Sequence, residues 1–571
     1  MNDTAYSADN KISSEPKSDK MRQPKRLPIS IWVSASIFAL VPVARWYLFD
    51  TDHQLANLVG IGISLIGCLV AYVGCWQLFA KSAARKFFFL AMPVVFIALG
   101  LSFFEFVGFT GETLPVFRTK PWLKRPSNDT TNVIKSDGLV RRSTGTQESI
   151  ASSFSSLQFL GSDRNGVIRN EEFSVAWGDK LPTVLWKIPI GAGWSSFAVS
   201  NGLAITLEQI DDQESLTAFE LTTGKVVWRH KSPGRHMQAF GGLGPRATPT
   251  IHRTKVFSQT ALGIVSCVEL ETGKLVWEQD LLKLAGINQE TSEKSISWGR
   301  SGSPLVFDGQ VVVPFGGKTN NGTTRSLISF DLETGKEIWS GGDQQIAYSS
   351  PVLLNLCGVR QIVSINEGSA TGHNSRNGLV LWSTPWPSKS NGDACSSQPV
   401  AVDSRRLLLG KGYALGSKLI ELSYSGTSES NESDPTFWKV DTVWSNTRIL
   451  KTKFTSATAF DGLLYGLSDG ILECVDPRDG SRVWRGKRYG HGQSMIVNGH
   501  LLITTEDGRV VLIPATASDQ GHEIAQLPVL EGVTWNVPAV AGPFLLIRNA
   551  EFAACIVSKK DAGHDAGSLS Q

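Results

Sequence analysis

The sequence predicts an all-β domain, an eight-bladed β-propeller, preceded by three transmembrane α-helices. Three observations predict this fold class. Three long apolar runs lie before residue 107, a short phrase with Thr-Gly and Trp recurs through the rest of the chain, and Gly- or Ser-rich segments alternate with these phrases. The 571 residues therefore divide into an anchor and one large repetitive domain, rather than several domains of about 150 residues each.

The apolar runs predict a membrane anchor. They cover residues 27–44, 55–80 and 87–106, and each is close to the roughly 17–25 residues that cross a bilayer as a helix. The second run has no polar face at a 3.6-residue period, as a buried helix of a soluble domain would have. We therefore predict a three-helix transmembrane anchor over residues 27–107, after a disordered cytoplasmic tail at residues 1–26.

The distribution of Lys and Arg predicts the orientation of this anchor. Six basic residues precede the first run and three lie at residues 81–86, whereas the loop at residues 45–53 has one Arg and two Asp. Basic flanks stay in the cytoplasm, so the chain after the third run is expected outside it, in a multi-pass protein of the cell (inner) membrane. Four basic residues at 118–125 favour the opposite orientation, but residues ahead of the first span usually dominate.

The amino-acid composition changes after residue 107. Residues 108–156 are rich in Ser, Thr, Asn and Asp, which predicts a flexible linker. The propeller is expected over residues 157–560, and residues 561–571 are expected to form a disordered tail.

One phrase recurs in the long domain, Leu-x-Thr-Gly-Lys-x-x-Trp in its fullest form. Full copies cover residues 221–228, 270–277 and 332–339, and degenerate copies cover 375–382 and 477–484. The Thr-Gly or Asp-Gly pair is a hairpin turn in which Gly takes positive φ, and the returning strand ends in Trp. The Trp residues that end such strands are Trp186, Trp228, Trp277, Trp339, Trp382, Trp444 and Trp484.

The spacing of these Trp residues predicts the number of blades. Six intervals from Trp186 to Trp484 average about 50 residues, and one more reaches a strand near residues 523–527, which makes eight outer strands. Four strands in each period fit a propeller blade. The last stretch, residues 537–558, has no Trp strand of its own. We predict that the strand at residues 183–188 joins it and closes the ring.

The phrase resembles the tryptophan-docking motif of the PQQ-like eight-bladed β-propellers, over about residues 158–559. That family includes quinoprotein alcohol and glucose dehydrogenases and the non-enzymatic barrel-assembly lipoprotein. The resemblance implies that the motif Trp packs between neighbouring blades and has no catalytic role. Our first interpretation is a membrane-anchored extracytoplasmic binding or assembly module. The alternative is a membrane-bound PQQ-dependent dehydrogenase that oxidises an alcohol or sugar and passes electrons to quinone.

The alternative would require cofactor ligands. In the dehydrogenases that the resemblance points to, Ca²⁺ beside PQQ is held by a Glu, an Asn and an Asp. Oxygen donors that suit Ca²⁺ follow inner strands at Glu208, Asn366, Glu367, Asn549 and Glu551, but none matches a family position by motif. The chain also has no adjacent Cys pair and no haem motif. We therefore predict no metal site, and PQQ and Ca²⁺ are expected only under the alternative.

The segments before the inner strands are the candidate ligand or partner site, because in a propeller they gather at one face around the channel. Aromatic, Arg, Lys and Gln side chains there suit a planar, anionic or polar ligand. The same residues could instead fill the channel mouth and satisfy backbone groups. The candidates are Trp194, Arg246, Trp298, Arg300, Tyr348, Gln398, Lys453, His491, Gln493, Trp535 and Asn536.

Two further expectations concern this face. His491 is the one plausible general base among the candidates. The net charge is only +3, so the chain has no large basic field and no nucleic-acid partner is expected. The expected partners are the lipid bilayer and either a protein or a small polar ligand at the propeller funnel.

Overall fold

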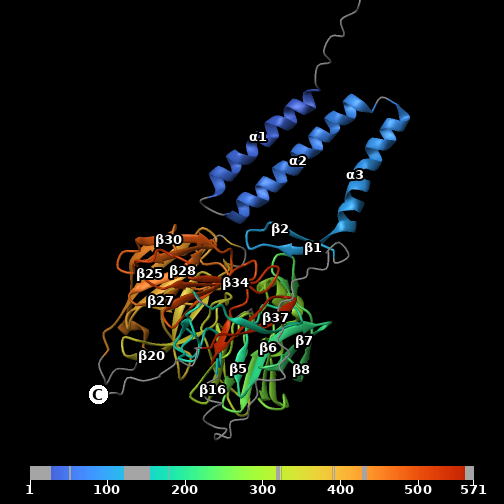
Figure 1. Ribbon diagram of the computed structural model, residues 1–571. Coiled ribbons are helices and arrows are strands. Elements are labelled where there is room, and N and C mark those ends of the chain that lie inside the picture. Colours follow the sequence, from blue (N-terminus) through green and yellow to red (C-terminus); the bar gives the residue numbers. More distant parts are fainter. Residues whose placement is uncertain are drawn as a thin grey trace, which may run out of the picture. The chain divides into compact units, whose positions relative to one another are not determined.

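The computed structural model describes residues 28–49, 53–80, 82–120, 155–178, 180–316, 322, 324–388, 390, 393–426 and 434–559 (Figure 1). The two predicted disordered tails and most of the predicted linker lie outside the described residues. The chain forms two compact units. One comprises Met1–Trp46 with Val59–Leu101, and the other Tyr47–Leu58 with Ser102–Gln571.

The first unit contains apolar helices. They are α1 (Ile29–Phe49), α2 (His53–Phe79) and α3 (Ala83–Phe103). By length and composition, α2 and α3 are long and apolar enough to cross a membrane, whereas the apolar part of α1 ends at Ala44. Among the described residues, the prediction of three transmembrane helices is thus reduced to two candidate spans and one shorter apolar helix.

A β-hairpin follows α3. Strands β1 (Phe104–Phe109) and β2 (Pro115–Thr119) pair antiparallel, where the sequence predicts the end of a span and the start of a flexible linker. Aromatic and polar side chains alternate at Phe104, Glu105 and Phe106, at the start of β1, which favours a strand with two different faces. The aromatic content of β1 accounts for its assignment to the apolar run.

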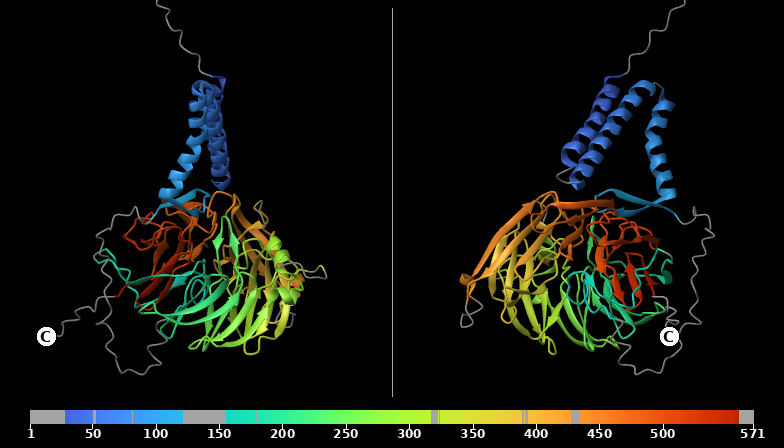
Figure 2. Two further views of the ribbon diagram at one scale, coloured as in Figure 1. Left: turned by 90° about the vertical axis from the view of Figure 1, so that its right-hand side faces the viewer. Right: turned by 60° about the vertical axis from the view of Figure 1, so that its left-hand side comes forward.

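Eight sheets of four or five strands are described in the remainder of the chain and form the blades of a propeller, which confirms the predicted eight-bladed propeller (Figure 2). Blade 1 comprises β5 (Ala198–Ser200), β6 (Leu203–Ile210), β7 (Gln213–Glu220) and β8 (Val226–Pro233). Blade 2 comprises β11 (Thr250–His252), β12 (Lys255–Gln259), β13 (Ile264–Glu269) and β14 (Leu275–Asp280). Blade 3 comprises β15 (Leu305–Phe307), β16 (Gln310–Pro314), β17 (Leu327–Asp331) and β18 (Glu337–Gly341). Blade 4 comprises β19 (Val352–Leu356), β20 (Val359–Asn366), β21 (Ser369–Asn374) and β22 (Val380–Pro385).

The second half of the ring repeats the pattern. Blade 5 comprises β23 (Val400–Ala401), β24 (Arg406–Lys411), β25 (Gly416–Tyr424) and β26 (Trp438–Asn446). Blade 6 comprises β27 (Thr458–Phe460), β28 (Leu463–Ser468), β29 (Ile471–Val475) and β30 (Arg482–Arg488). Blade 7 comprises β31 (Gln493–Val497), β32 (His500–Thr504), β33 (Arg509–Pro514) and β34 (Ala525–Pro528), with β3 (Val167–Ile168) added parallel to β31. Blade 8 comprises β35 (Ala539–Ala541), β36 (Phe544–Arg548), β37 (Phe552–Val557) and β4 (Thr183–Pro189).

Blade 8 closes the ring as predicted. Its outer strand, β4, comes from the start of the domain and pairs antiparallel with β37. Smaller elements lie between blades, namely the β9–β10 hairpin (Met237–Gln238 and Gly242–Leu243), α5 (Leu281–Ala285) and α6 (Gln289–Ser295), and the 3-10 helix η3 (Pro435–Phe437) lies within blade 5, between β25 and β26. Closure joins the first and last blades directly, so the ends of the domain cannot separate without loss of this sheet.

The contacts of the Trp residues explain the repeated phrase. In blades 8, 1 and 2, the indole Nε1 of Trp186, Trp228 or Trp277 donates to the carbonyl that opens the phrase of the next blade, at 2.9, 2.9 and 3.1 Å. The ring also covers the Gly of that phrase: a Cβ on Gly273 would lie 2.5 Å from the Trp228 ring. The Leu carbonyl and the Gly of each full phrase therefore contact the Trp of the preceding blade. The Trp of the same phrase is directed toward the following blade.

At the degenerate phrase of blade 4, the hydrogen bond of the docking Trp has a different acceptor. Trp339 donates to Gln310 Oε1 at 3.0 Å, and Gln310 in turn donates to the carbonyl of Ser375 in blade 4 at 2.9 Å. A Cβ on Gly378 would still lie 2.3 Å from the Trp339 ring. Trp382 donates to Gln361 of its own blade, whereas Trp444 and Trp484 donate across to Pro477 and Thr516.

A buried arginine that the sequence did not single out ties the first part of the domain to three blades. Arg164 Nη1 donates to the carbonyls of Ser303 (3.2 Å) and Pro351 (3.0 Å), and Nη2 donates to Pro304 and to Thr250 Oγ1. Burial lowers the pKa of Arg164 to about 9. The guanidinium therefore acts as a multiple hydrogen-bond donor at the junction of blades 2, 3 and 4.

A pair of glycine variants tests the docking contact. Gly273 and Gly309 both have positive φ, 68° and 74°, but nothing lies within 4 Å of a Cβ on Gly309. Gly309→Ala should cost only the strain of a left-handed residue, about 1–2 kcal/mol. Gly273→Ala adds a clash with Trp228, so its decrease in apparent Tm should be at least about twofold larger. Equal decreases, measured by differential scanning calorimetry, would contradict the docking role of Gly273.

Loss of Arg164 should destabilise the domain as a whole. Arg164→Ala leaves several buried carbonyls without their donor, which should lower the free energy of unfolding by about 2–4 kcal/mol. The exposed Arg169 serves as the control, and Arg169→Ala should change stability by less than about 0.5 kcal/mol. Chemical denaturation followed by Trp fluorescence measures both, and equal stability of the two variants would refute the role of Arg164.

Candidate functional site

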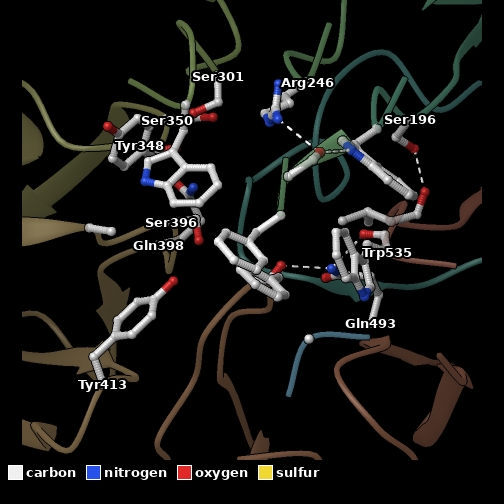
Figure 3. A pocket seen from close by; sticks show the side chains of 18 of the residues that line it. Ser196, Arg246, Ser301, Tyr348, Ser350, Ser396, Gln398, Tyr413, Gln493 and Trp535 are labelled. Atoms are coloured by element: carbon white, nitrogen blue, oxygen red, sulfur yellow. Dashed lines mark hydrogen bonds between the residues drawn. The ribbon is translucent and has the colours of Figure 1, made fainter. Parts of the chain in front are cut away.

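A cavity of ≈ 320 Å³ lies where the segments before the inner strands meet (Figure 3). All eight blades contribute to its wall, and most of that wall is aromatic or small and polar. The predicted candidates that line it are Trp194, Arg246, Trp298, Tyr348, Gln398, Gln493 and Trp535. The sequence did not single out four further aromatic residues of the wall, Phe159, Phe240, Tyr413 and Phe454.

The other four candidates lie outside the cavity wall. Arg300 is buried and donates to Ser292 Oγ and the carbonyl of Phe315, so it supports α6 and blade 3. Asn536 donates to the carbonyl of Ser195 at 2.8 Å and joins blades 8 and 1. Lys453 lies over the Tyr413 ring and 3.9 Å from Asp469, behind the wall.

His491, the fourth of these candidates, lies beneath the β1–β2 hairpin. Burial, with the nearby charge of Lys453, lowers the pKa of its imidazole to about 3. The side chain is therefore neutral at physiological pH and does not line the cavity. The structure thus does not place it where a general base for a ligand in this cavity would have to lie.

The aromatic part of the wall is held in place by internal hydrogen bonds. The Trp194 and Trp535 rings lie 4.7 Å apart, and the Phe454 and Trp535 rings lie 4.9 Å apart. Gln493 Nε2 donates to the carbonyls of Phe454 and Trp535, so this candidate positions the aromatic residues. In Figure 3, Tyr348 lies across the cavity from Trp535. A flat ring would therefore find a stacking surface on one side and polar groups on the other.

Arg246 is the one charged side chain among the described residues that line the cavity. Its Nη1 and Nη2 donate to the carbonyls of Gly244 (3.0 Å) and Gly241 (2.8 Å). Burial lowers its pKa to about 10, so the guanidinium keeps its charge at neutral pH. Trp194 Nε1 donates to the same Gly241 carbonyl at 2.6 Å, which couples the cation to the aromatic wall.

Two buried titratable groups that the sequence did not single out are close enough to Arg246 to interact with its charge. Burial raises the pKa of Glu214 to about 7, and burial together with Arg246 lowers the pKa of His236 to about 4. Glu214 Oε2 accepts from the backbone N–H of Ala261 at 2.9 Å. Within the described structure, Glu214 Oε1 and His236 Nε2 have no hydrogen-bond partner. Glu214 belongs to β7, more than 30 residues before Arg246, so the sequence alone did not place this carboxyl group beside the guanidinium.

The tip of the β1–β2 hairpin covers the cavity. Thr110, Gly111 and Thr113 line it, together with Gln54 and Leu58 from the start of α2, all within the same unit. The backbone N–H of Gly111 donates to Glu506 Oε1 at 2.6 Å. A Cβ at position 111 would lie 2.3 Å from the His491 ring, so only Gly fits this approach.

Glu506 connects the hairpin to the aromatic wall. Besides Gly111, it accepts from Trp535 Nε1 (2.9 Å) and from the backbone N–H of His491 (3.2 Å). Two ion pairs hold the hairpin on either side of this point, Arg488 with Glu112 and Arg118 with Glu551. The sequence placed most of this region in a linker because the partners of the hairpin come from blades 6, 7 and 8, about 400 residues later.

Two of the five oxygen donors at inner-strand ends, Glu208 and Asn366, are engaged within their blades. The Glu208 carboxylate accepts from Gly191 N (2.7 Å) and Thr217 Oγ1 (2.6 Å) and pairs with Arg229. The Asn366 amide is bonded to Thr371. Across the described ranges, no three His, Cys, Asp or Glu side chains group as metal ligands would. These two donors are thus engaged in stabilising the blades.

Removal of Glu506 should release the hairpin. Glu506→Ala deletes the acceptor of three hydrogen bonds, and the loss of charge-assisted bonds of this kind should speed amide exchange in residues 104–119 by about 10–100-fold. The neighbouring Asp507 bonds Thr505 and Arg509 rather than the hairpin, so Asp507→Ala serves as the control. Hydrogen–deuterium exchange mass spectrometry measures both. Unchanged protection in Glu506→Ala would show that the hairpin is held without this contact.

Comparisons with known proteins agree with the propeller repeat. A family model described as "Outer membrane protein assembly factor BamB" matches residues 212–485. The outer membrane protein assembly factor BamB of Yersinia pestis is 21% identical over 311 residues, which cover 53% of this chain and 71% of that protein. BamB from Moraxella catarrhalis matches in structure with a TM-score of 0.42 and 14% identity, over 66% of this chain and 100% of the other. A quinohemoprotein alcohol dehydrogenase from Comamonas testosteroni matches with a TM-score of 0.36 and 13% identity, over 74% and 84% of the two chains.

Proposed function

We propose that this chain, a PQQ-like eight-bladed β-propeller with apolar N-terminal helices, is a membrane-anchored extracytoplasmic binding or assembly module. Its binding site would be the axial cavity between the blades and the hairpin. The helices would hold the propeller at the inner membrane, with the N-terminus in the cytoplasm. The chain would then present its aromatic cavity to molecules outside the cytoplasm.

The chemistry of the cavity wall is the observation that carries this proposal. Among the described lining residues there is no carboxylate, imidazole, thiol or lysine, and the single charged group is Arg246. Oxidation of an alcohol or sugar needs a group that accepts a proton close to the substrate. Aromatic surfaces with one fixed cation instead suit recognition of a planar polar or anionic group by stacking and charge.

A protein partner is the class of binding target that we favour. The matching family model and the relative from Yersinia pestis are both described as an outer membrane protein assembly factor. The cavity would then accept a side chain or a small polar group that the partner carries. The dehydrogenase alternative has less support, because Glu208 and Asn366 are engaged within their blades and no carboxylate is among the described residues that line the cavity.

Site-specific crosslinking tests the proposal. A benzophenone amino acid at Phe240, a half-exposed lining residue, should crosslink a partner of defined mass in native membranes. Arg246→Met or Trp535→Ala should reduce that crosslink by about 10-fold or more, because each removes a fixed part of the wall. Arg376→Ala, at an exposed site on another loop, should leave it unchanged.

The dehydrogenase alternative is tested with the same full-length protein in nanodiscs. Addition of PQQ and Ca²⁺ should give no dye-linked oxidation of alcohols or sugars. Saturable quinone binding with turnover would instead overturn the proposal in favour of the enzyme. Melting temperatures of the variants, compared with wild type, separate a loss of binding from a loss of folding.

A further inference from the structure

The β1–β2 hairpin has one aromatic face. Phe104 and Phe106 of β1 and Phe117 of β2 remain 45%, 49% and 60% exposed. Phe106 is paired directly with Phe117, with their rings 5.7 Å apart. Since side chains alternate between the two faces of a strand, these three residues share one face. A two-stranded sheet that leaves three Phe side chains uncovered is unusual for a surface in water.

The opposite face of the hairpin is polar and is bound to the propeller. Glu105 and Arg118 are directly paired across the strands and form an ion pair at 3.4 Å. Arg118 also pairs with Glu551 of blade 8, and the hairpin tip is held by Glu506. These contacts prevent the hairpin from turning its aromatic face inward. The Phe face therefore points away from the blades to which the hairpin is attached.

The position of the hairpin in the chain indicates what covers this face. Strand β1 begins at Phe104, the residue directly after the last residue of α3, a candidate membrane span. A chain that leaves the hydrocarbon at Phe103 must place the next residues in the interfacial layer, whatever the tilt of the helix. Apolar aromatic side chains are stabilised in that layer, and the flanking Lys120 suits anionic headgroups.

We propose that the aromatic face of the hairpin, Phe104, Phe106 and Phe117, docks on the lipid bilayer at its interface. This inference rests on the membrane anchor of the proposed function and adds an orientation to it. The loop at the tip of the same hairpin covers the axial cavity, so docking turns the cavity end of the propeller toward the membrane. A ligand or partner group then reaches the cavity from the membrane side, along the hairpin.

Photocrosslinking to lipid tests this docking. Benzophenone amino acids replace Phe106 or Phe117, which preserves an aromatic side chain and avoids a variant that fails to fold. The control position is Ile338, an exposed apolar residue on the outer strand of blade 3. After irradiation of the full-length chain in phosphatidylcholine–phosphatidylglycerol nanodiscs, mass spectrometry should detect lipid adducts at positions 106 and 117 at least about fivefold above position 338.

The outcomes separate this inference from the proposed function. A chain that incorporates into nanodiscs but forms no excess adduct at either position overturns the docking and leaves the anchor intact. Crosslinked dimers in place of lipid adducts would show that a second copy covers the face, which also overturns it. A chain that does not incorporate at all, or is released by alkaline carbonate, refutes the anchor on which both proposals depend.

Discussion

The packing of a Trp from one blade against a Gly of the next, described at six of the eight blade junctions, is the contact on which the rest of the structure depends. It combines a buried aromatic surface with one directed hydrogen bond, so it fixes both the spacing and the rotation between blades. Repeated around a ring and closed by β4 on β37, it leaves no free sheet end between the first and last blades. The segments before the inner strands are thereby forced together, and the cavity is a consequence of that closure.

Two sets of contacts hold the wall of the cavity in place, one within the blades and one with the hairpin. The blades supply aromatic rings whose N–H groups are already bonded within the protein, and Arg246 is held by backbone carbonyls. The hairpin then covers this arrangement through Gly111 and Glu506, which are separated by almost the whole propeller in sequence. A preorganised aromatic wall with one cation favours recognition over chemistry, since no proton-accepting side chain is placed at the described surface. If the aromatic face of the hairpin lies on lipid, the same hairpin both docks on the membrane and covers the entrance to the cavity.

Residues with a repeated role could be predicted, and residues with a unique role could not. The phrase recurs, so eight blades, the ring-closing strand and the residues around the funnel follow from periodicity alone. Arg300, Lys453, His491 and Asn536 share the segments of the lining residues, but their side chains are directed away from the cavity wall, and spacing contains no information on that direction. Arg164, Glu214 and Glu506 each form contacts across blades, with partners that no local pattern indicates. The first part of β1 was assigned to a helix, because a strand with one aromatic face has the same composition as an apolar run.

The sequence by itself determined the repeat, its number and the positions of its docking Trp residues, because these depend on local turns and on a spacing that recurs. It also determined the apolar character of the N-terminal helices, which depends on composition. Only the tertiary structure decided which side chains face the cavity and which form hydrogen bonds within the blades instead. It also decided that a hairpin covers the site. Those outcomes depend on contacts between residues hundreds of positions apart, whose geometry exists only after the ring has closed.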